Sequence, residues 1–315
     1  KKKRVCLEYV SANPTGLMHI GHARGAVLGD TIASILEEVG HDVCREYYIN
    51  DAGEQIKKLL QTVIFHIKAK SDKTVSISDE LYPGDYLREL SLIIAKTQKT
   101  ISKNLKINLD SILALIMKDI KNDLSSIGVK HNSFISEKEI STKENVNDLI
   151  KKLNEKELSY LGYQDKPMSS LDKNWKKEQQ LLFRSKKLGD DSDRALLKPN
   201  GELTYFMSDI LYHQEKVERN FDILLNIWGI DHSGYVKRLK NSINALNPKK
   251  EINFIIKLTA LVNLLEGKKT VKMSKRKGNY ITLREVVEKV GSDVLRFMMI
   301  SRNADKKIDF DFETV

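Results

Sequence analysis

The sequence predicts an α/β protein built on a doubly wound parallel sheet, with a connective segment inserted between its two halves. An apolar, β-favouring run from Val5 to Val10 enters a turn-rich loop, and a helical pattern follows from His19 to Val39. Val43 to Ile49 reads as the next strand, which completes a strand, helix and strand in the order typical of parallel sheets. Phe221 to Trp228 has the apolar composition of a buried strand. The sheet is therefore expected to begin early in the chain and to resume late.

The remaining elements follow in order along the chain. Gly40 is a natural end for the first helix, and lysine-rich helical segments are expected from about Gly53 to Ile127. Residues 136–200 are polar and are expected to be irregular, with Tyr163 to Gln180 the most loop-like part. The predicted domains are a first half of the sheet domain over 1–135, a connective insertion over 136–200, and a second half over 201–315.

Charge points to a polyanionic partner. The 315 residues contain 53 Lys and Arg against 43 Asp and Glu, a formal net charge of +10. Residues 236–277 alone hold twelve Lys or Arg and two acidic residues, Glu251 and Glu266. Nucleic acid is the expected partner of such a strip.

The cysteines and the apolar runs indicate the compartment. Cys6 and Cys44 are too few for a disulfide framework or a cysteine-built zinc site, and we interpret both as core residues of a protein in a reducing compartment. The start of the chain lacks the features of a signal peptide, and no apolar run approaches membrane-spanning length. A cytoplasmic protein without a membrane partner is expected.

Two motifs carry the candidate chemistry. His19-Ile20-Gly21-His22 places two imidazoles in a first helical turn, where backbone N–H groups and the helix dipole favour phosphate, and Gly21 leaves room for a nucleotide. Histidines so spaced are also found as ordinary surface or core-edge residues. The second motif, residues 272–279, is a basic loop containing Gly278, whose ammonium groups could close over a triphosphate. A solvated charge run or a nonspecific RNA contact is the alternative for that loop alone.

Taken together, these motifs resemble the HIGH and KMSK signatures of class I aminoacyl-tRNA synthetases, in the expected order and separation. The sequence is similar to the arginyl-tRNA synthetases in five further blocks, which are residues 8–16, 47–53, 201–210, 228–232 and 308–311. Leu17-Met18 replaces a commoner Pro-Leu, Lys277 stands where a small residue is usual, and the stretch from Tyr163 to Gln180 matches poorly. The resemblance implies a Rossmann-type, HUP-like catalytic domain.

The resemblance also implies the site residues. It gives catalytic roles to His19, His22, Lys272 and Lys275. It assigns ATP to Thr15, Gly16, His19, Gly21, His22, Gly229, Asp231, His232, Met273 and Lys275, and arginine to Glu8, Ser11, Asn13, His19, Tyr205 and Asp209. The chemistry agrees with that substrate, because a guanidinium is a planar fork of five donors that carboxylates can accept in pairs. Mg²⁺ is expected on the phosphates, with no metal site built by the protein.

The implied function is two-step ligation of L-arginine to tRNA(Arg). Arginine would first be activated by ATP as arginyl-adenylate and then pass to the 2′-OH of the terminal adenosine of the tRNA. A monomeric catalytic fragment is expected, without the N-terminal tRNA-contact domain and the C-terminal anticodon-binding domain of the family. Two alternatives stay open: an HxGH-type nucleotidyltransferase acting on a small molecule, and a non-catalytic tRNA-binding paralogue.

Overall fold

The computed structural model describes residues 1–69, 77–78, 80–97, 108–164, 177–267, 269–270 and 281–314. Its central sheet has five strands in the order β3-β2-β1-β7-β8, and all neighbouring strands are parallel. Their bounds are β1 (Arg4–Glu8), β2 (Asp42–Ile49), β3 (Ser133–Ser136), β7 (Ile223–Gly229) and β8 (Phe254–Thr259). The predicted α/β class with a parallel sheet is confirmed.

The strand order places a switch point beside β1. The chain runs outward from β1 through β2 to β3, and it later resumes on the other side of β1 with β7 and β8. In open parallel sheets ligands bind outside the carboxyl ends of the strands where the order reverses. Glu8 ends β1 and Gly229 ends β7, so both lie at that edge.

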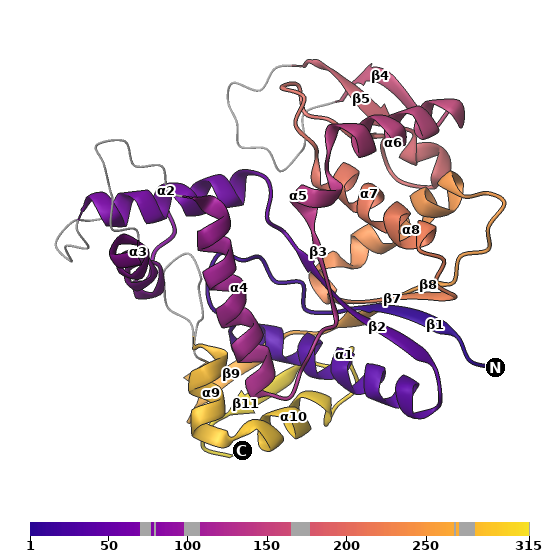
Figure 1. Cartoon of the computed structure of the whole chain (residues 1–315). Helices are drawn as coiled ribbons and strands as arrows, with labels where there is room; N and C mark the ends of the chain where they lie inside the picture. The colour runs from indigo at the N-terminus through magenta and orange to yellow at the C-terminus, as the bar shows by residue number, and fades with distance from the viewer. Residues whose placement is uncertain are drawn as a thin grey trace.

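Alternate side chains of β1 enter two separate cores. Val5 and Leu7 belong to one apolar cluster and Cys6 to the other, as the period of two in a strand requires. The first cluster is covered by α1 (Ile20–Glu38), α2 (Glu54–Lys68), α3 (Asp85–Thr97), α4 (Leu109–Ser126), α9 (Leu283–Val290) and α10 (Ser292–Ile300). The second is covered by α6 (Lys143–Glu155), α7 (Tyr205–Glu218) and α8 (Ser233–Leu246), which Figure 1 shows on the opposite side of the sheet.

The segment 136–200 is more regular than the sequence suggests. It contains α5 (Glu137–Ile140), α6, β4 (Ser159–Tyr163), β5 (Gln179–Phe183), the short helix η1 (Ser185–Leu188) and β6 (Arg194–Ala195). The three strands form an antiparallel sheet. The predicted irregularity is therefore wrong for the described part of this segment, while its role as a connective insertion stays a prediction.

A small third sheet lies near the C-terminus. It joins β9 (Val262–Glu266) to β10 (Lys269–Thr270) and to β11 (Ile308–Asp311). Buried residues of β9 and β11 extend the first core beneath α1 and α10. Among the described residues, no helix combines the length and the apolar character needed to cross a bilayer.

Candidate active site

The start of α1 is built from the two motif histidines. His19 caps the helix in an extended conformation, and its Nδ1 accepts from the Gly21 N–H at 3.1 Å. His22 Nδ1 accepts from the His19 N–H at 3.2 Å, and the two rings stack with centroids 3.8 Å apart. Because an accepting nitrogen carries no proton, each neutral ring holds its proton on Nε2. In the neutral form, both rings therefore carry an Nε2–H group close to the helix start.

Gly21 is required by the same arrangement. A Cβ at this position would lie 2.9 Å from the Nδ1 and Cε1 atoms of His19, closer than packed side chains allow. The glycine lets the His19 ring fold back onto the helix end, which is a reason for glycine that the sequence motif alone does not reveal.

The segment that follows the basic motif lies beside this helix start. Lys272, Met273 and Lys275 lie outside the described residues, but both flanks of the loop are placed. β10 precedes it, and Thr282 follows as the N-cap of α9. Thr282 pairs with His19 in an antiparallel bridge, and the Leu283 N–H donates to the Met18 carbonyl at 2.9 Å. The C-terminal base of the loop thus lies directly beside the histidine motif.

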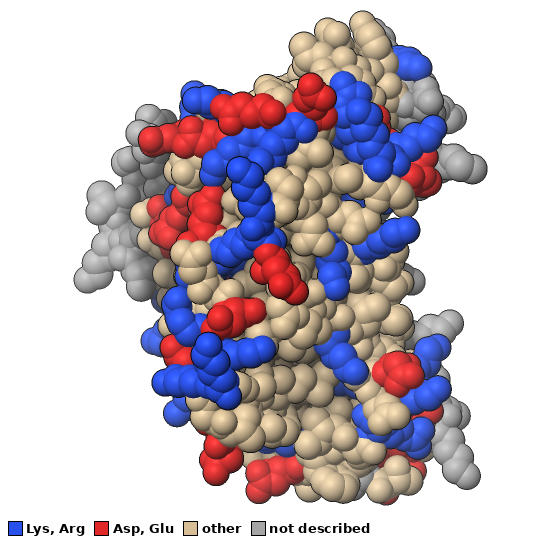
Figure 2. Space-filling model, turned by 90° about the vertical axis from the view of Figure 1, so that its right-hand side faces the viewer, with Lys and Arg blue, Asp and Glu red and all other residues tan. Residues whose placement is uncertain are grey.

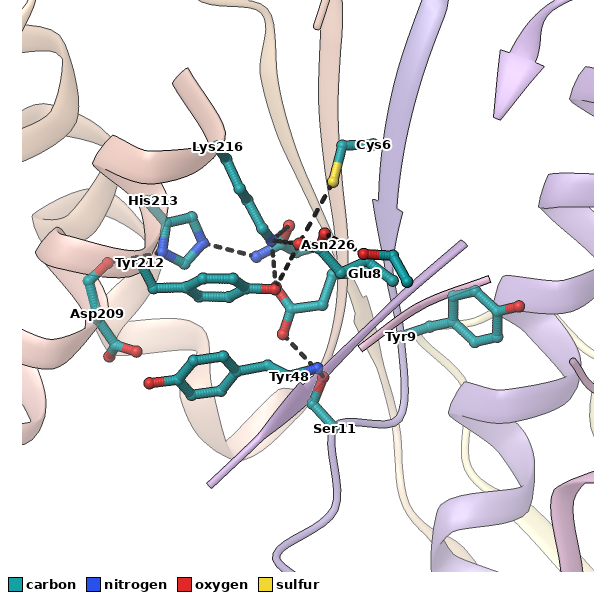
Figure 3. Close-up of polar contacts among 12 residues, drawn as sticks. Cys6, Glu8, Tyr9, Ser11, Tyr48, Asp209, Tyr212, His213, Lys216 and Asn226 are labelled. Atoms are coloured by element: carbon teal, nitrogen blue, oxygen red, sulfur yellow. Dashed lines mark hydrogen bonds and ion pairs between the residues drawn. The ribbon is translucent and has the colours of Figure 1, made fainter. Parts of the chain in front are cut away.

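A cluster of carboxyl and tyrosine side chains lies between α7 and the central sheet (Figure 3). Thr204 caps α7, and Asp209 follows one turn into the helix. Burial, together with the nearby carboxylates of Glu8 and Glu137, raises the pKa of Asp209 to about 7, although a hydrogen bond with Tyr235 acts in the opposite direction. The Tyr48 hydroxyl is buried without a hydrogen-bond partner within the described parts of the chain, and Figure 3 shows it directed toward Asp209. Carboxylate and hydroxyl oxygens of this kind are acceptors that suit a cation with several donors.

Glu8 already has strong partners. Its Oε2 accepts from the Lys216 ammonium at 2.6 Å, and its Oε1 accepts from the Ser11 hydroxyl at 3.0 Å. Lys216 is fully buried on α7 and also donates to Asn226 Oδ1 at 3.2 Å. The sequence assignments of Glu8 and Ser11 therefore come together, but the charge of Glu8 is largely matched within the protein.

A second carboxylate completes the buried network. Glu46 of β2 receives both guanidinium nitrogens of Arg219, at 2.6 and 3.0 Å, and the Tyr212 hydroxyl at 2.7 Å. Burial opposes its ionisation, yet Lys216 and Arg219 hold the pKa of Glu46 down to about 2. The Tyr212 ring stacks on Tyr48 with centroids 4.1 Å apart. The network thus holds Tyr212 against Tyr48, beside Asp209 (Figure 3).

Sequence reasoning named Glu8 and Asp209 but missed their supporting partners Glu46, Tyr212, His213 and Lys216. Asp209, Tyr212, His213 and Lys216 lie three, one and three residues apart on α7, which places them on one helical face. A row of polar residues at helical spacing, in a helix with several apolar residues, was the signal in the sequence that could have indicated a buried polar network. It does not reveal the partners on β1 and β2, which come from distant parts of the chain.

The remaining sequence-predicted residues occupy the same edge of the sheet. Thr15 and Gly16 lie in the loop from β1 to α1, where the Thr15 N–H donates to the Asn13 carbonyl at 2.8 Å. The Asn13 amide donates to Gln55 Oε1 at 2.6 Å. Tyr205 is the first residue of α7, and 73% of its surface is exposed. It therefore does not pack among the buried side chains.

A tight turn closes β7. The short helix η2 (Ile230–His232) follows Gly229, and a Cβ at Gly229 would lie 2.3 Å from Asp231 Oδ1. His232 Nε2 is 3.6 Å from Asp231 Oδ2, and both side chains are exposed. The turn presents polar groups at the carboxyl end of β7, where the switch point predicts a ligand.

The chain is similar to known proteins over nearly its whole length. The family model described as the catalytic domain of class I tRNA synthetases (R) matches residues 1–311. Arginine–tRNA ligase of Wolbachia pipientis wMel is 45% identical over 312 residues, which cover 98% of this chain and 55% of that protein. The corresponding ligase of Pelagibacter ubique is 44% identical and covers all of this chain and 56% of that protein. The chain spans about half the length of these curated relatives.

Solved structures agree. A crystal structure of a candidate arginyl-tRNA synthetase from Campylobacter jejuni superposes with a TM-score of 0.82 at 31% identity, covering 99% of this chain and 66% of that one. The arginyl-tRNA synthetase of Thermus thermophilus, at 16% identity and a TM-score of 0.65, shares the fold over 99% of this chain and 60% of its own. On this evidence the chain belongs to the arginine-type family of class I aminoacyl-tRNA synthetases, whose catalytic domain it matches from end to end.

Proposed function

We propose that the chain is the catalytic core of an arginine–tRNA ligase, which activates L-arginine with ATP and transfers it to the 2′-OH of the terminal adenosine of tRNA(Arg). Family membership supports the reaction class. The structural observation that carries the proposal is the bridge between His19 and Thr282. It supports a nucleotide site in which the histidine helix start and the lysine loop act on the same phosphates.

In the first step the arginine carboxylate attacks the α-phosphorus of ATP, and pyrophosphate leaves. The step needs no protein nucleophile, so the protein contributes position and charge stabilisation. The Nε2–H groups of His19 and His22 donate to oxygens of the α-phosphate. Lys272 and Lys275 neutralise the departing pyrophosphate.

Arginine is held at the carboxyl edge of β1. Asp209 accepts the guanidinium, because burial and the neighbouring carboxylates raise its pKa and a cation bound there would be favoured. Glu8 contributes through the lone pairs that Lys216 and Ser11 leave available. Asn13 and His19 hold the α-amino and α-carboxylate groups.

The adenosine lies against the turn after β7, formed by Gly229, Asp231 and His232, and the loop residues Thr15 and Gly16 complete its phosphate side. Mg²⁺ binds to the phosphates. Over the described ranges, the cluster close enough to hold a metal is Cys6, Cys44 and Glu46, and thiols do not suit Mg²⁺. Phosphate and water oxygens would supply its ligands, with charge neutralisation as its contribution.

The tRNA approaches through phosphate attraction. Some cations of the basic strip, residues 236–277, are paired within the protein. Arg238 forms an ion pair with Asp190 at 2.5 Å, and Lys250 donates to the Val217 carbonyl at 2.6 Å. Figure 2 shows Lys and Arg side chains interspersed with acidic ones on the face it presents. The available cations therefore contribute affinity that falls with salt and no sequence readout.

Pyrophosphate exchange tests the proposal. Exchange of labelled pyrophosphate into ATP is measured with each of the twenty amino acids, with and without tRNA(Arg), in the complete gene product. Exchange is expected with arginine alone among the twenty. A small-molecule nucleotidyltransferase would show no dependence on arginine or tRNA, and a non-catalytic paralogue would bind tRNA without exchange.

Location and assembly follow from the proposed reaction. Aminoacylation takes place where tRNA is used, so the protein is proposed to work in the cytoplasm. One chain supplies all the proposed site residues, and a monomer is therefore proposed. Light scattering of the purified protein tests that assembly, and a mass of twice the chain would contradict it.

Gly21→Ala is expected to lower the exchange rate about ten- to a hundredfold, because the new Cβ forces the His19 ring from the helix start. Gly25→Ala is the matched control on the same helix. Its Cβ would meet no atom within 4 Å, so that variant should keep its activity and gain about 0.5–1 kcal/mol of stability from helix propensity. Equal activity of the two variants would argue against the placement of His19.

A further inference from the structure

The chain's two cysteines face each other across neighbouring strands. Cys6 of β1 is the direct register partner of Cys44 of β2. Paired residues of parallel strands project to the same face. Accordingly, the two sulfurs and a carboxylate oxygen of Glu46 all lie within 4.8 Å of one another.

The two thiols differ in access and acidity. Cys6 is fully buried, whereas Cys44 is partly exposed. A hydrogen bond from the Cys6 thiol lowers the pKa of Cys44 to about 7, although burial and Glu46 act in the opposite direction. Cys44 is thus the accessible sulfur with thiolate character. Cys6 is the buried neighbouring thiol that could react with it after oxidation.

A metal does not suit this cluster. Glu46 already binds Arg219 through both oxygens, and it also receives the Tyr212 and Ser133 hydroxyls at 2.7 and 3.1 Å. Its acceptor positions are therefore occupied. Two sulfurs alone are fewer than the four ligands of a structural zinc site. The remaining chemistry of two adjacent thiols is their oxidation.

We propose that Cys6 and Cys44 form an oxidisable pair that closes to an intrachain disulfide in the presence of a hydroperoxide. The Cys44 thiolate attacks an oxygen of hydrogen peroxide, the O–O bond breaks, and a sulfenic acid forms, while the departing hydroxide takes up the proton that the thiol had released and leaves as water. The Cys6 sulfur then attacks the sulfenic sulfur, which breaks the S–O bond and releases a second water with the Cys6 proton. Two electrons pass from the thiols to the peroxide.

The strand geometry permits this bond. Neighbouring strands lie about 4.7–4.9 Å apart, and disulfides join Cα atoms about 4.4–6.8 Å apart. Closure requires the sulfurs to approach, with little movement of the two strands. A disulfide constrained by two fixed strands is expected to be strained. Strained disulfides are more easily reduced than structural ones, so we expect this bond to be reversible.

Closure also changes the wall of the proposed arginine pocket. The Cys6 sulfur, which must move to form the bond, lies 3.5 Å from Glu46 Oε1 and contacts that carboxylate directly. Glu46 orients Tyr212, which stacks on Tyr48 beside Asp209. Cys6 also precedes Glu8 by two residues on the same face of β1. This consequence, which rests on the proposed function, is a several-fold loss of arginine affinity in the oxidised chain.

The bond itself is tested chemically. The reduced chain is treated with hydrogen peroxide, unfolded and alkylated, and its intact mass is measured. We expect both thiols to be protected from alkylation, with a mass loss of two hydrogen atoms that dithiothreitol reverses. Two alkylatable thiols after treatment, or a disulfide found only between two chains, would overturn the proposal.

Single variants test the order of events. Cys6→Ser should leave a Cys44 sulfenic acid that dimedone captures, whereas Cys44→Ser should leave Cys6 unlabelled. The reverse labelling would overturn the assignment of Cys44 as the attacking sulfur. Because Cys44 is the more exposed position, Cys44→Ser keeps the test valid even if a serine at the buried position disturbs folding, which circular dichroism reports.

Calorimetry with arginine tests the consequence separately. Oxidised wild-type chain should bind arginine several-fold more weakly, with recovery on reduction, and the arginine affinity of both serine variants should not change on treatment with peroxide. A disulfide that leaves arginine affinity unchanged would overturn the coupling to the pocket. Absence of arginine binding by the reduced chain would instead contradict the proposed function, and the mass measurement would still decide the disulfide.

Discussion

Lys275→Ala is expected to lower the rate of arginine activation by about 10²- to 10³-fold, while the dissociation constant for arginine changes by about twofold or less. The proposed role of Lys275 is to neutralise charge that develops as pyrophosphate leaves, so its loss is felt in the transition state. The base of its loop lies beside His19 through Thr282. Single-turnover formation of arginyl-adenylate measures the rate, and calorimetry measures the affinity.

Lys277→Ala is the matched control for this experiment. It removes the same charge from the same basic loop, two residues beyond the KMSK signature. Its activation rate should stay within about threefold of the wild type, because a diffuse loop charge is screened by salt. Equal losses of rate in the two variants would mean that the loop acts only through its overall positive charge. Full activity of Lys275→Ala would contradict the catalytic role proposed for Lys275.

Local patterns predicted the frame of the fold. The run from Val5, the helical periodicity from His19 and the strand from Val43 each depend on neighbours in sequence, and β1, α1 and β2 appear where expected. The stop at Gly40 is also confirmed by its φ of 90°, which glycine adopts without strain. Elements that bury one continuous apolar face are visible in sequence.

The inserted segment shows where this reasoning stops. Of the residues of α6, only Leu149 and Leu153 are buried, and Leu161 and Tyr163 of β4 are largely exposed. A small sheet with both faces partly in water has no clear alternation of apolar and polar residues. Its pairing with β5 depends on contacts that hydrophobic periodicity does not encode.

The sequence motifs proposed the ligating residues of the candidate site but gave no sign of the residues that support them. A lysine inside a helix is expected at the surface, yet Lys216 is fully buried because Glu8 and Asn226 come to it from β1 and β7. Conversely, Tyr205 was expected beside the guanidinium and is exposed. Motifs locate groups by sequence position, whereas their protonation and pairing are decided by tertiary neighbours.

Asp209→Asn is expected to weaken arginine binding by about a hundredfold and to leave ATP binding nearly unchanged, because an amide replaces one charged acceptor of the guanidinium. The pH dependence adds an independent signature. With its pKa at about 7, Asp209 is mostly ionised at pH 8 and mostly protonated at pH 6. Arginine affinity of the wild type should therefore fall about tenfold from pH 8 to pH 6, and the variant should show no such step. Calorimetry at both pH values measures it.

The same substitution is expected to stabilise the unliganded chain at pH 8. The folded pKa of Asp209 lies above the ordinary value of 3.8, so between about pH 4 and pH 7 the folded chain holds a proton that the unfolded chain has lost. Stability falls as pH rises through that window, by about 2 to 4 kcal/mol. Asparagine removes this cost, and the melting temperature at pH 8 should rise as arginine affinity falls.

Two matched controls separate this cost from a general effect of removing a carboxylate. Glu218→Gln changes an exposed residue of the same helix, paired with Lys152, and should alter neither arginine affinity nor stability appreciably. Asp190→Asn should act in the opposite direction on stability. Burial disfavours its ionised form, yet Arg238 and Arg194 hold the pKa of Asp190 below its usual range, so its charge stabilises the fold at pH 8. If Asp209→Asn instead lowered the melting temperature as Asp190→Asn does, the Asp209 carboxylate would be a structural partner within the fold, and the guanidinium would have to be held elsewhere.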